Sequence, residues 1–149
     1  MSEPSVADAE LALTHYGLNA EQAKTAVAGL LSRGWSTRAL CIGARARFHC
    51  EYCGLDLLSG PDAYRAWQED HIVPKHLGLD LEGDVYALAC VTCNVRMKGR
   101  WDPRNAVPPN VTREQYIEAI KKHIAEARSK TMTEIEEVRR LLHLPSIAT

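Results

Sequence analysis

The chain has 149 residues, of which 46% are hydrophobic and 25% are charged, so it is long enough for one domain with its own core. No apolar run approaches the roughly 20 residues that a membrane-spanning helix needs, and Met1 to Pro4 lack the basic and apolar parts of a secretion signal. We therefore expect a cytoplasmic protein with no membrane partner, and the net charge of −1 does not by itself indicate a nucleic-acid partner.

The N-terminal region, residues 1–47, is predicted to be helical. Ser5 can cap a first helix, and Asn19 with Gln22 three residues later forms a capping-box pattern for a second helix. A third helix is expected to begin after Ser36 and to end just before Cys50. None of these residues is of a catalytic type, so we interpret the region as a helical collar or a partner surface.

The central region, residues 48–104, is expected to hold two strands and a short helix. Strands are predicted over residues 67–73 and 85–89, and the loop between them carries proline and glycine. A short helix is predicted over residues 93–99. The central region therefore has the order strand, loop, strand and helix.

The C-terminal region, residues 105–149, is predicted to be helical again. Thr112 with Gln115, and Thr133 with Glu136, are two capping-box patterns, so the segment is either one long helix or two. The whole chain is thus predicted to be α+β and mainly helical, and its amphipathic helical flanks suggest a homodimer.

Four of the five cysteines form two regular pairs, Cys50 with Cys53 and Cys90 with Cys93. A Cys-x-x-Cys turn places two thiolates on one side of a tight loop, and two such turns can close a tetrahedral zinc site. Four thiolates leave no open position for water, so this zinc is expected to be structural. A disulfide framework and four unliganded cysteines are the alternatives, and the odd cysteine count argues against the first. Cys41 is interpreted as a small core residue.

Asp70 and His71 lie between the two cysteine pairs, and Asn94 directly follows the last cysteine. Asp70 can offer a hard oxygen ligand to Mg²⁺ or Mn²⁺, and Asn94 can offer a second one. His71 titrates near neutral pH and can take a proton from an attacking water. These three residues outline a site for phosphodiester hydrolysis. A surface aspartate beside a hydrogen-bonded histidine is the simpler alternative.

The stretch from Glu51 to Asp84 is acidic, and basic segments flank it. Residues 33–49 contain four arginines and no acid, and residues 94–105 contain four basic residues against one acid. Such flanks suit a phosphate backbone held across a metal-binding pocket, although a mixed solvated surface is the alternative. The residues expected to contact nucleic acid are Arg96, Lys98 and Arg100, with Lys75 and His76 in the loop after His71.

Taken together, these motifs resemble the HNH endonuclease family in its zinc-stapled form, over roughly residues 48–104. The segments that carry the resemblance are Cys50-Glu-Tyr-Cys53-Gly54, Asp70-His71-Ile-Val-Pro74-Lys75, Leu88-Ala-Cys90-Val-Thr-Cys93-Asn94 and Lys98-Gly99. The resemblance implies a ββα-metal fold, in which a β-hairpin and a helix surround one divalent cation. By position, Asp70 matches the metal-binding acid, His71 the general base and Asn94 the second metal ligand.

The function implied by this resemblance is a metal-dependent DNA endonuclease that acts on duplex DNA and nicks one strand at each active site. Val85 departs from the family pattern, because it stands where the family has an asparagine that braces the loop of the base. This departure favours an alternative, a catalytically degenerate zinc-stapled module that binds nucleic acid or protein. A nuclease subunit that is active only in a larger assembly is a third interpretation.

Overall fold

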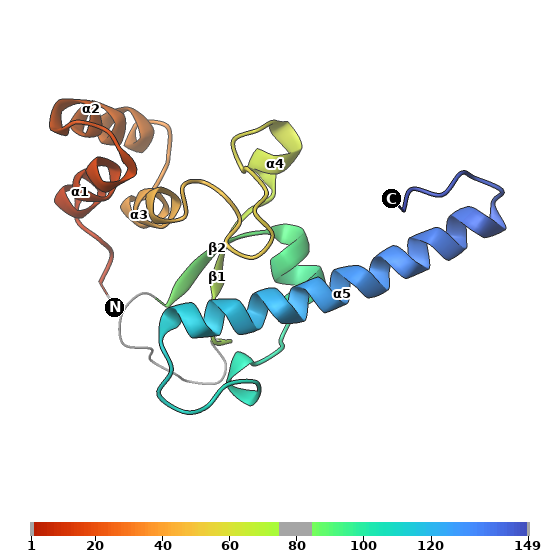
Figure 1. The fold of residues 1–149 in the computed structure, drawn as a ribbon. Coiled ribbons are helices and arrows are strands. Elements are labelled where there is room, and N and C mark those ends of the chain that lie inside the picture. Colours follow the sequence, from red (N-terminus) through yellow and green to blue (C-terminus); the bar gives the residue numbers. More distant parts are fainter. Residues whose placement is uncertain (1, 75–84, 149) are drawn as a thin grey trace.

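The structure is a computed structural model that describes residues 2–74 and 85–148, and it combines helices with a small two-stranded sheet (Figure 1). The α+β, mainly helical class predicted from the sequence is confirmed. The elements described are α1 (Val6–Tyr16), α2 (Ala20–Leu31), α3 (Thr37–Arg45), α4 (Pro61–Arg65), β1 (Trp67–His71), β2 (Tyr86–Cys90), the π-helical η2 (Thr92–Lys98), the short 3₁₀ turn η3 (Pro103–Asn105) and α5 (Arg113–Leu141).

The helix starts are set by local capping. Ser5, Asn19 and Thr112 each accept a hydrogen bond from the backbone N–H three residues later, and the side chain of that later residue bonds back, as the capping boxes predict. The third helix ends at Arg45, earlier than expected. Arg47 and Phe48 adopt φ values of +52° and +57°, and this left-handed turn directs the chain into the first cysteine pair.

The sheet is an antiparallel hairpin in which Trp67 lies opposite Cys90 and His71 lies opposite Tyr86. Because side chains alternate along a strand, Asp70 points to one face of β1 and His71 to the other. Regular pairing ends at His71 rather than at residue 73. One further backbone bond, from the Ile72 N–H to the Val85 carbonyl at 3.0 Å, continues the ladder.

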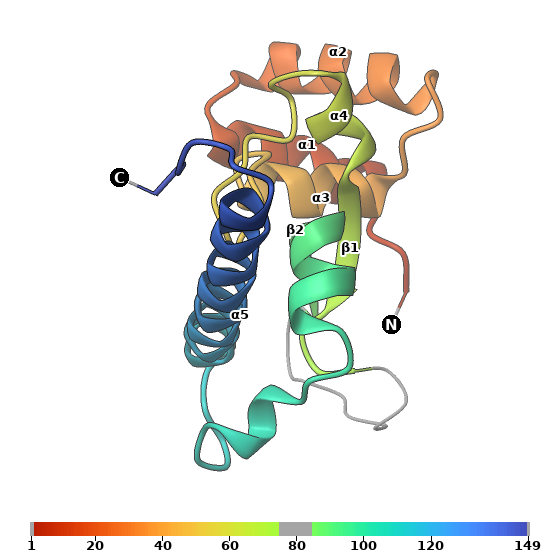
Figure 2. The same ribbon diagram turned by 90° about the vertical axis from the view of Figure 1, so that its right-hand side faces the viewer.

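Two apolar clusters form the core. The first lies among α1, α2 and α3 and includes Leu40 and Phe48. The second includes Leu88 of β2 and Ile120 of α5, so the first half of α5 belongs to the same core as the hairpin (Figure 2). Trp67 packs against both clusters and joins them. The domain limits 1–47, 48–104 and 105–149 stay a prediction.

The C-terminal region forms one helix of 29 residues rather than two. Its second half extends away from the rest of the molecule (Figure 1), and it exposes Met132, Val138 and Leu141 to solvent. Pairing of two copies through the helical flanks stays a prediction. In the part of the chain that the structure describes, no helix is long and apolar enough to cross a membrane.

Candidate nuclease site

The four paired cysteines meet in one cluster. The sulfurs of Cys50, Cys53, Cys90 and Cys93 all lie within 4.8 Å of one another, and the Sγ atoms of Cys53 and Cys90 are 3.8 Å apart. A zinc ion bound by four sulfurs at about 2.3 Å gives sulfur–sulfur edges of about 3.8 Å in an ideal tetrahedron. No disulfide links these cysteines. The geometry therefore fits a metal ion such as zinc, as the spacing predicts.

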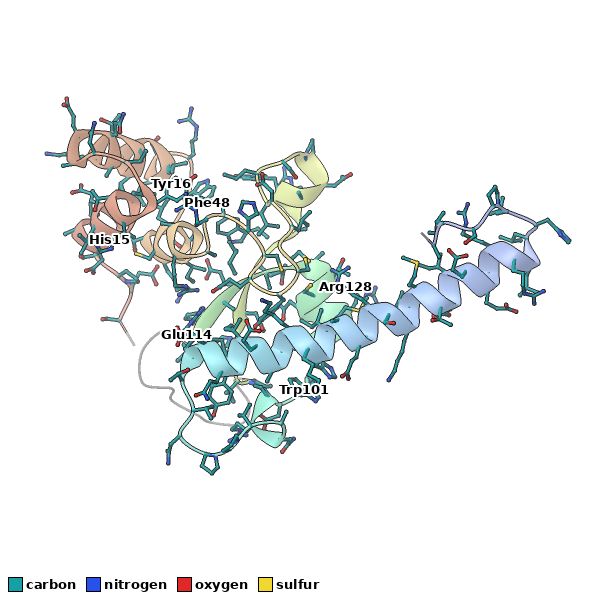
Figure 3. All side chains as sticks on the ribbon, viewed as in Figure 1. His15, Tyr16, Phe48, Trp101, Glu114 and Arg128 are labelled. Carbon is teal, nitrogen blue, oxygen red and sulfur yellow. The ribbon has the colours of Figure 1, made fainter. Side chains whose placement is uncertain are left out.

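Hydrogen bonds and a nearby arginine act on the sulfur atoms of the cluster. A hydrogen bond from the Cys93 thiol lowers the pKa of the Cys50 thiol to about 5, whereas the same bond raises the pKa of Cys93. Arg128 reaches the cluster from α5, with its Nη2 atom 3.2 Å from the Cys93 sulfur (Figure 3). Arg128 thus supplies positive charge beside sulfur ligands that are anionic when they bind zinc. Its position, far along the chain, gave no signal in the sequence.

The first cysteine turn is anchored to the sheet through Glu51. Its carboxylate accepts hydrogen bonds from the Leu88 N–H at 2.6 Å, from Arg45 at 3.0 Å and from Arg113 at 2.9 Å. Both arginines also donate to the Tyr86 carbonyl. This network fixes the metal-binding turn against β2, α3 and α5, and it was not predicted from the sequence.

Asp70 is buried, with 6% of the residue exposed, and has two partners. Its Oδ2 atom accepts a hydrogen bond from the Tyr52 hydroxyl at 2.6 Å and lies 3.0 Å from the Lys98 ammonium. The same ammonium is 3.2 Å from Oδ1. Burial raises the pKa of Asp70, and the charge of Lys98 and the bond from Tyr52 oppose that rise. Asp70 is therefore a buried carboxylate held by a hydroxyl and a cation.

The placement of Lys98 corrects one prediction from the sequence. Its side chain is only 1% exposed, and its ammonium also donates to the His71 carbonyl at 3.0 Å. The ammonium faces the inside of the protein and not the surface, so the expected contact of Lys98 with a DNA phosphate was wrong for this structure. Lys98 ends η2, and Gly99 follows with φ +53° to turn the chain away.

Asn94 lies one helical turn before Lys98 and faces the same side of β1. Its side-chain amide nitrogen donates to Oε1 of Gln68 at 3.3 Å, and Gln68 is two residues before Asp70. Side chains two residues apart on a strand share a face and are about 7 Å apart. The structure thus places Asn94 on the face of β1 that carries Asp70, next to Gln68, and the amide oxygen of Asn94 has no hydrogen-bond partner among the described residues.

His71 lies on the opposite face of β1, where it packs against Tyr86 with ring centroids 4.7 Å apart. The imidazole is half-buried. Arg38 of α3 lies over the ring of Tyr86, with its guanidinium carbon 5.1 Å from the ring centre. Tyr86 and Arg38 therefore shape the surroundings of His71, and neither was singled out from the sequence.

The remaining predicted contacts are on the surface or outside the described part of the chain. Arg96 and Arg100 are exposed on and just after η2, as a phosphate contact requires. Lys75 and His76 lie outside the described residues. Cys41 is half-buried beside the N-terminal core, in agreement with a structural role.

A β-hairpin and the helical segment that follows it form a small α+β module, and this module contains the four clustered cysteines. Asp70, His71 and Asn94 belong to it. Residues 50–100 match the family model for HNH endonuclease, so the resemblance found in the sequence is confirmed for this segment. Comparison with curated proteins and with solved structures gave no match for the chain. The match indicates a nuclease-family function, which is related to nucleic acids.

Proposed function

We propose that this protein is a metal-dependent DNA endonuclease that hydrolyses phosphodiester bonds and nicks one strand at each active site. The observation that carries the proposal is the arrangement at the end of β1. There, Asp70 and Asn94 line one face, His71 lines the other, and all three belong to the segment that matches the family. The ends expected from the family resemblance are a 5′-phosphate and a 3′-hydroxyl.

The oxygen atoms on the first face fit a hard divalent cation such as Mg²⁺ or Mn²⁺. Asp70 offers a carboxylate and Asn94 an amide oxygen, and a cation held by two such ligands keeps several waters. Asp70 already has a cationic partner in Lys98 at 3.0 Å. We infer that divalent-cation binding at Asp70 is in competition with the Lys98 ammonium. Zinc is the metal proposed for the four cysteines.

In the proposed mechanism, a ring nitrogen of His71 takes the proton of the attacking water. Asp70 and Asn94 are proposed to hold the divalent cation beside the phosphate that this water attacks. A cation held by Asp70 and Asn94 would supply Lewis-acid polarisation of the phosphate and would offset the charge on the leaving oxygen. Arg96 and Arg100 are proposed to hold flanking phosphates, which fixes position but reads little sequence.

The alternative, a degenerate binding module, is favoured by Val85. Against it, the backbone carbonyl of Val85 accepts the Ile72 N–H at 3.0 Å, and Ile72 is fully buried. The residue that follows the proposed base is thus braced without an asparagine side chain. The replacement of the family's asparagine by Val85 therefore does not leave this segment without support.

The experiment is a nicking assay with the zinc-loaded protein, supercoiled plasmid and added Mg²⁺ or Mn²⁺. His71→Ala is expected to reduce the nicking rate by about 10²- to 10⁴-fold, the usual contribution of a general base. His143→Ala is the matched control, because His143 is exposed near the C-terminal end, and it should nick at the wild-type rate. Equal rates for His71→Ala and the wild type would contradict the assigned base, and DNA binding without cleavage in every metal would favour the binding module.

A further inference from the structure

A cavity of about 470 Å³ lies where the turn between α2 and α3 meets α4 and the start of β1. This volume is in the range of small-molecule binding sites. Figure 2 shows α4 beside the layer of N-terminal helices and directly before β1. The residues that line the cavity and matter here are Arg33, Trp35, Tyr64, Arg65, Trp67 and Glu69. Neither the four clustered cysteines nor Asp70 line this cavity.

Three aromatic rings form its walls. Trp35 contacts Trp67 at 5.2 Å between ring centres, and it lies 6.4 Å from Tyr64. Trp67 is held firmly, since a Cβ atom added to Gly43 of α3 would come within 2.8 Å of its ring. Tyr64 remains 44% exposed at the mouth. The cavity therefore presents a fixed indole wall and an accessible phenol ring.

The charged groups around the cavity are mainly basic. Arg33 and Arg65 are exposed at its edge, and no described residue forms an ion pair with either of them. The single acid, Glu69, is bonded to Arg38 at 3.1 Å, so its charge is offset. Arg33 donates one hydrogen bond to the Gly29 carbonyl at 3.4 Å. Aromatic faces combined with exposed arginines are the features with which proteins hold single-stranded nucleic acid.

The cavity is continuous with the surface that carries His71. Trp67, Glu69 and His71 share one face of β1, and Arg38 links Glu69 to Tyr86, which packs on His71. Four residues of strand span about 13 Å, which is the length of about four stacked nucleotides in one strand. A strand that passes His71 can therefore reach the cavity.

We propose that this cavity binds one unstacked base of single-stranded nucleic acid, whose flanking phosphates contact Arg33 and Arg65. The proposal rests on the nuclease function proposed above and names the form of substrate that the protein holds beside its active site. A base inside a duplex cannot enter, because its two faces are covered by its neighbours, so the bound base belongs to an unpaired or extruded segment.

The test uses tryptophan fluorescence in a Trp101→Phe background. The chain has three tryptophans, so only Trp35 and Trp67 then report, and both belong to the cavity. The probes are an oligothymidylate of about twelve nucleotides, an abasic strand of the same length and charge, and a blunt duplex, all without added divalent cation. We expect the thymidine strand to quench the fluorescence and to bind about 5- to 150-fold more tightly than the abasic strand, as one stacked base does.

Variants at the mouth separate stacking from charge. Tyr64→Leu should reduce the preference for the base-containing strand to about one-fifth or less, and Tyr64→Phe should retain it. Arg65→Gln should weaken the binding of both strands equally. It should also reduce the slope of log affinity against log salt concentration by about 0.7, the value for one phosphate contact with a single strand. Arg140→Gln, on an exposed part of α5, is the matched control and should change neither.

Two outcomes overturn the proposal, and they differ in what they imply for the nuclease. If both strands bind with equal affinity, or if Tyr64→Leu keeps the preference while its circular dichroism is unchanged, the base pocket is wrong and DNA binding stands. If neither strand nor the duplex binds, the pocket fails, and plasmid nicking then decides the proposed function separately.

Discussion

Lys98→Met tests the buried ion pair at the centre of the site. The ammonium of Lys98 is the cationic partner of Asp70, at 3.0 Å from Oδ2 and 3.2 Å from Oδ1, and both side chains are almost fully buried. Methionine keeps a similar length without the charge. The variant therefore leaves a buried carboxylate with the Tyr52 hydroxyl as its remaining described partner.

The expected cost follows from this geometry. Removing one partner of a buried ion pair destabilises a protein by about 3–5 kcal/mol, because the remaining charge loses its compensation. For a chain of 149 residues, this corresponds to a fall in Tm of about 6–20 °C. Urea unfolding followed by circular dichroism, on the zinc-loaded protein without other divalent cations, measures the change in the free energy of unfolding.

The loss should be smaller in acid. A carboxyl whose pKa is higher in the folded than in the unfolded state stabilises the fold below its unfolded pKa, and this contribution is lost as the pH rises through the folded pKa. Burial raises the pKa of Asp70 above its ordinary value of 3.8, and Lys98 opposes the rise. Lys98→Met removes that opposition, so the folded-state pKa of Asp70 rises further and the stability is lost over a higher pH range. The variant should therefore lose less stability at pH 5 than at pH 7, relative to the wild type.

The double variant Asp70→Asn with Lys98→Met is the control, because it removes both charges. It should recover most of the loss. A Lys98→Met protein within 1 kcal/mol of the wild type, or a double variant no more stable than the single one, would refute the assignment of Lys98 as the partner that compensates Asp70.

Further variants test the other parts of the site. Lys98→Met should also bind Mn²⁺ more tightly than the wild type, measured by the electron paramagnetic resonance of free Mn²⁺, and Asp70→Asn should abolish that gain; unchanged affinity would contradict the competition between Lys98 and the cation. Cys90→Ser should lower the zinc content from about one ion per chain to none and cause a large loss of helical signal, measured with a colorimetric zinc indicator and circular dichroism; retained zinc would contradict the four-sulfur site. Arg128→Gln should weaken zinc binding by about 10- to 100-fold in a chelator competition, as loss of an outer-shell partner does, whereas Arg140→Gln should not. Gly43→Ala should cost about 1–3 kcal/mol of stability in urea unfolding, because the added methyl group would meet Phe48 and Trp67 below 3 Å.

The features that depend on neighbours in the sequence could be predicted well. Capping boxes and Cys-x-x-Cys turns are set by residues three positions apart, and the helix starts after Ser5, Asn19 and Thr112 and the cysteine cluster agree with the prediction. The pattern of Thr133 with Glu136 starts no helix, because it lies inside α5, where the Thr133 hydroxyl donates to the Ser129 carbonyl. The ends of elements were less accurate. The third helix ends early because Arg47 and Phe48 adopt a left-handed backbone conformation, which neither residue type favours and the sequence therefore does not predict.

The partners of the site residues could not be predicted, because they come from distant segments. Tyr52 and Lys98 are 18 and 28 positions away from Asp70, and Arg128 is 35 positions away from Cys93. Charge alone suggested that Lys98 was a surface residue, since a lysine is rarely buried unless it is paired. Only the packing of η2 on β1 reveals that its pair is Asp70.

The relation between Val85 and the base follows from the same packing. In the family, an asparagine side chain braces the loop of the base, and its loss here suggested a weakened site. In this chain, the backbone carbonyl of Val85 accepts the Ile72 N–H, the buried side chain of Ile72 fixes the same segment to the core, and Lys98 donates to the carbonyl of His71. Every residue has a backbone carbonyl, so the acceptor at position 85 is present whatever side chain stands there. The support of His71 therefore depends on the hairpin and on Lys98 rather than on the side chain that the family pattern requires.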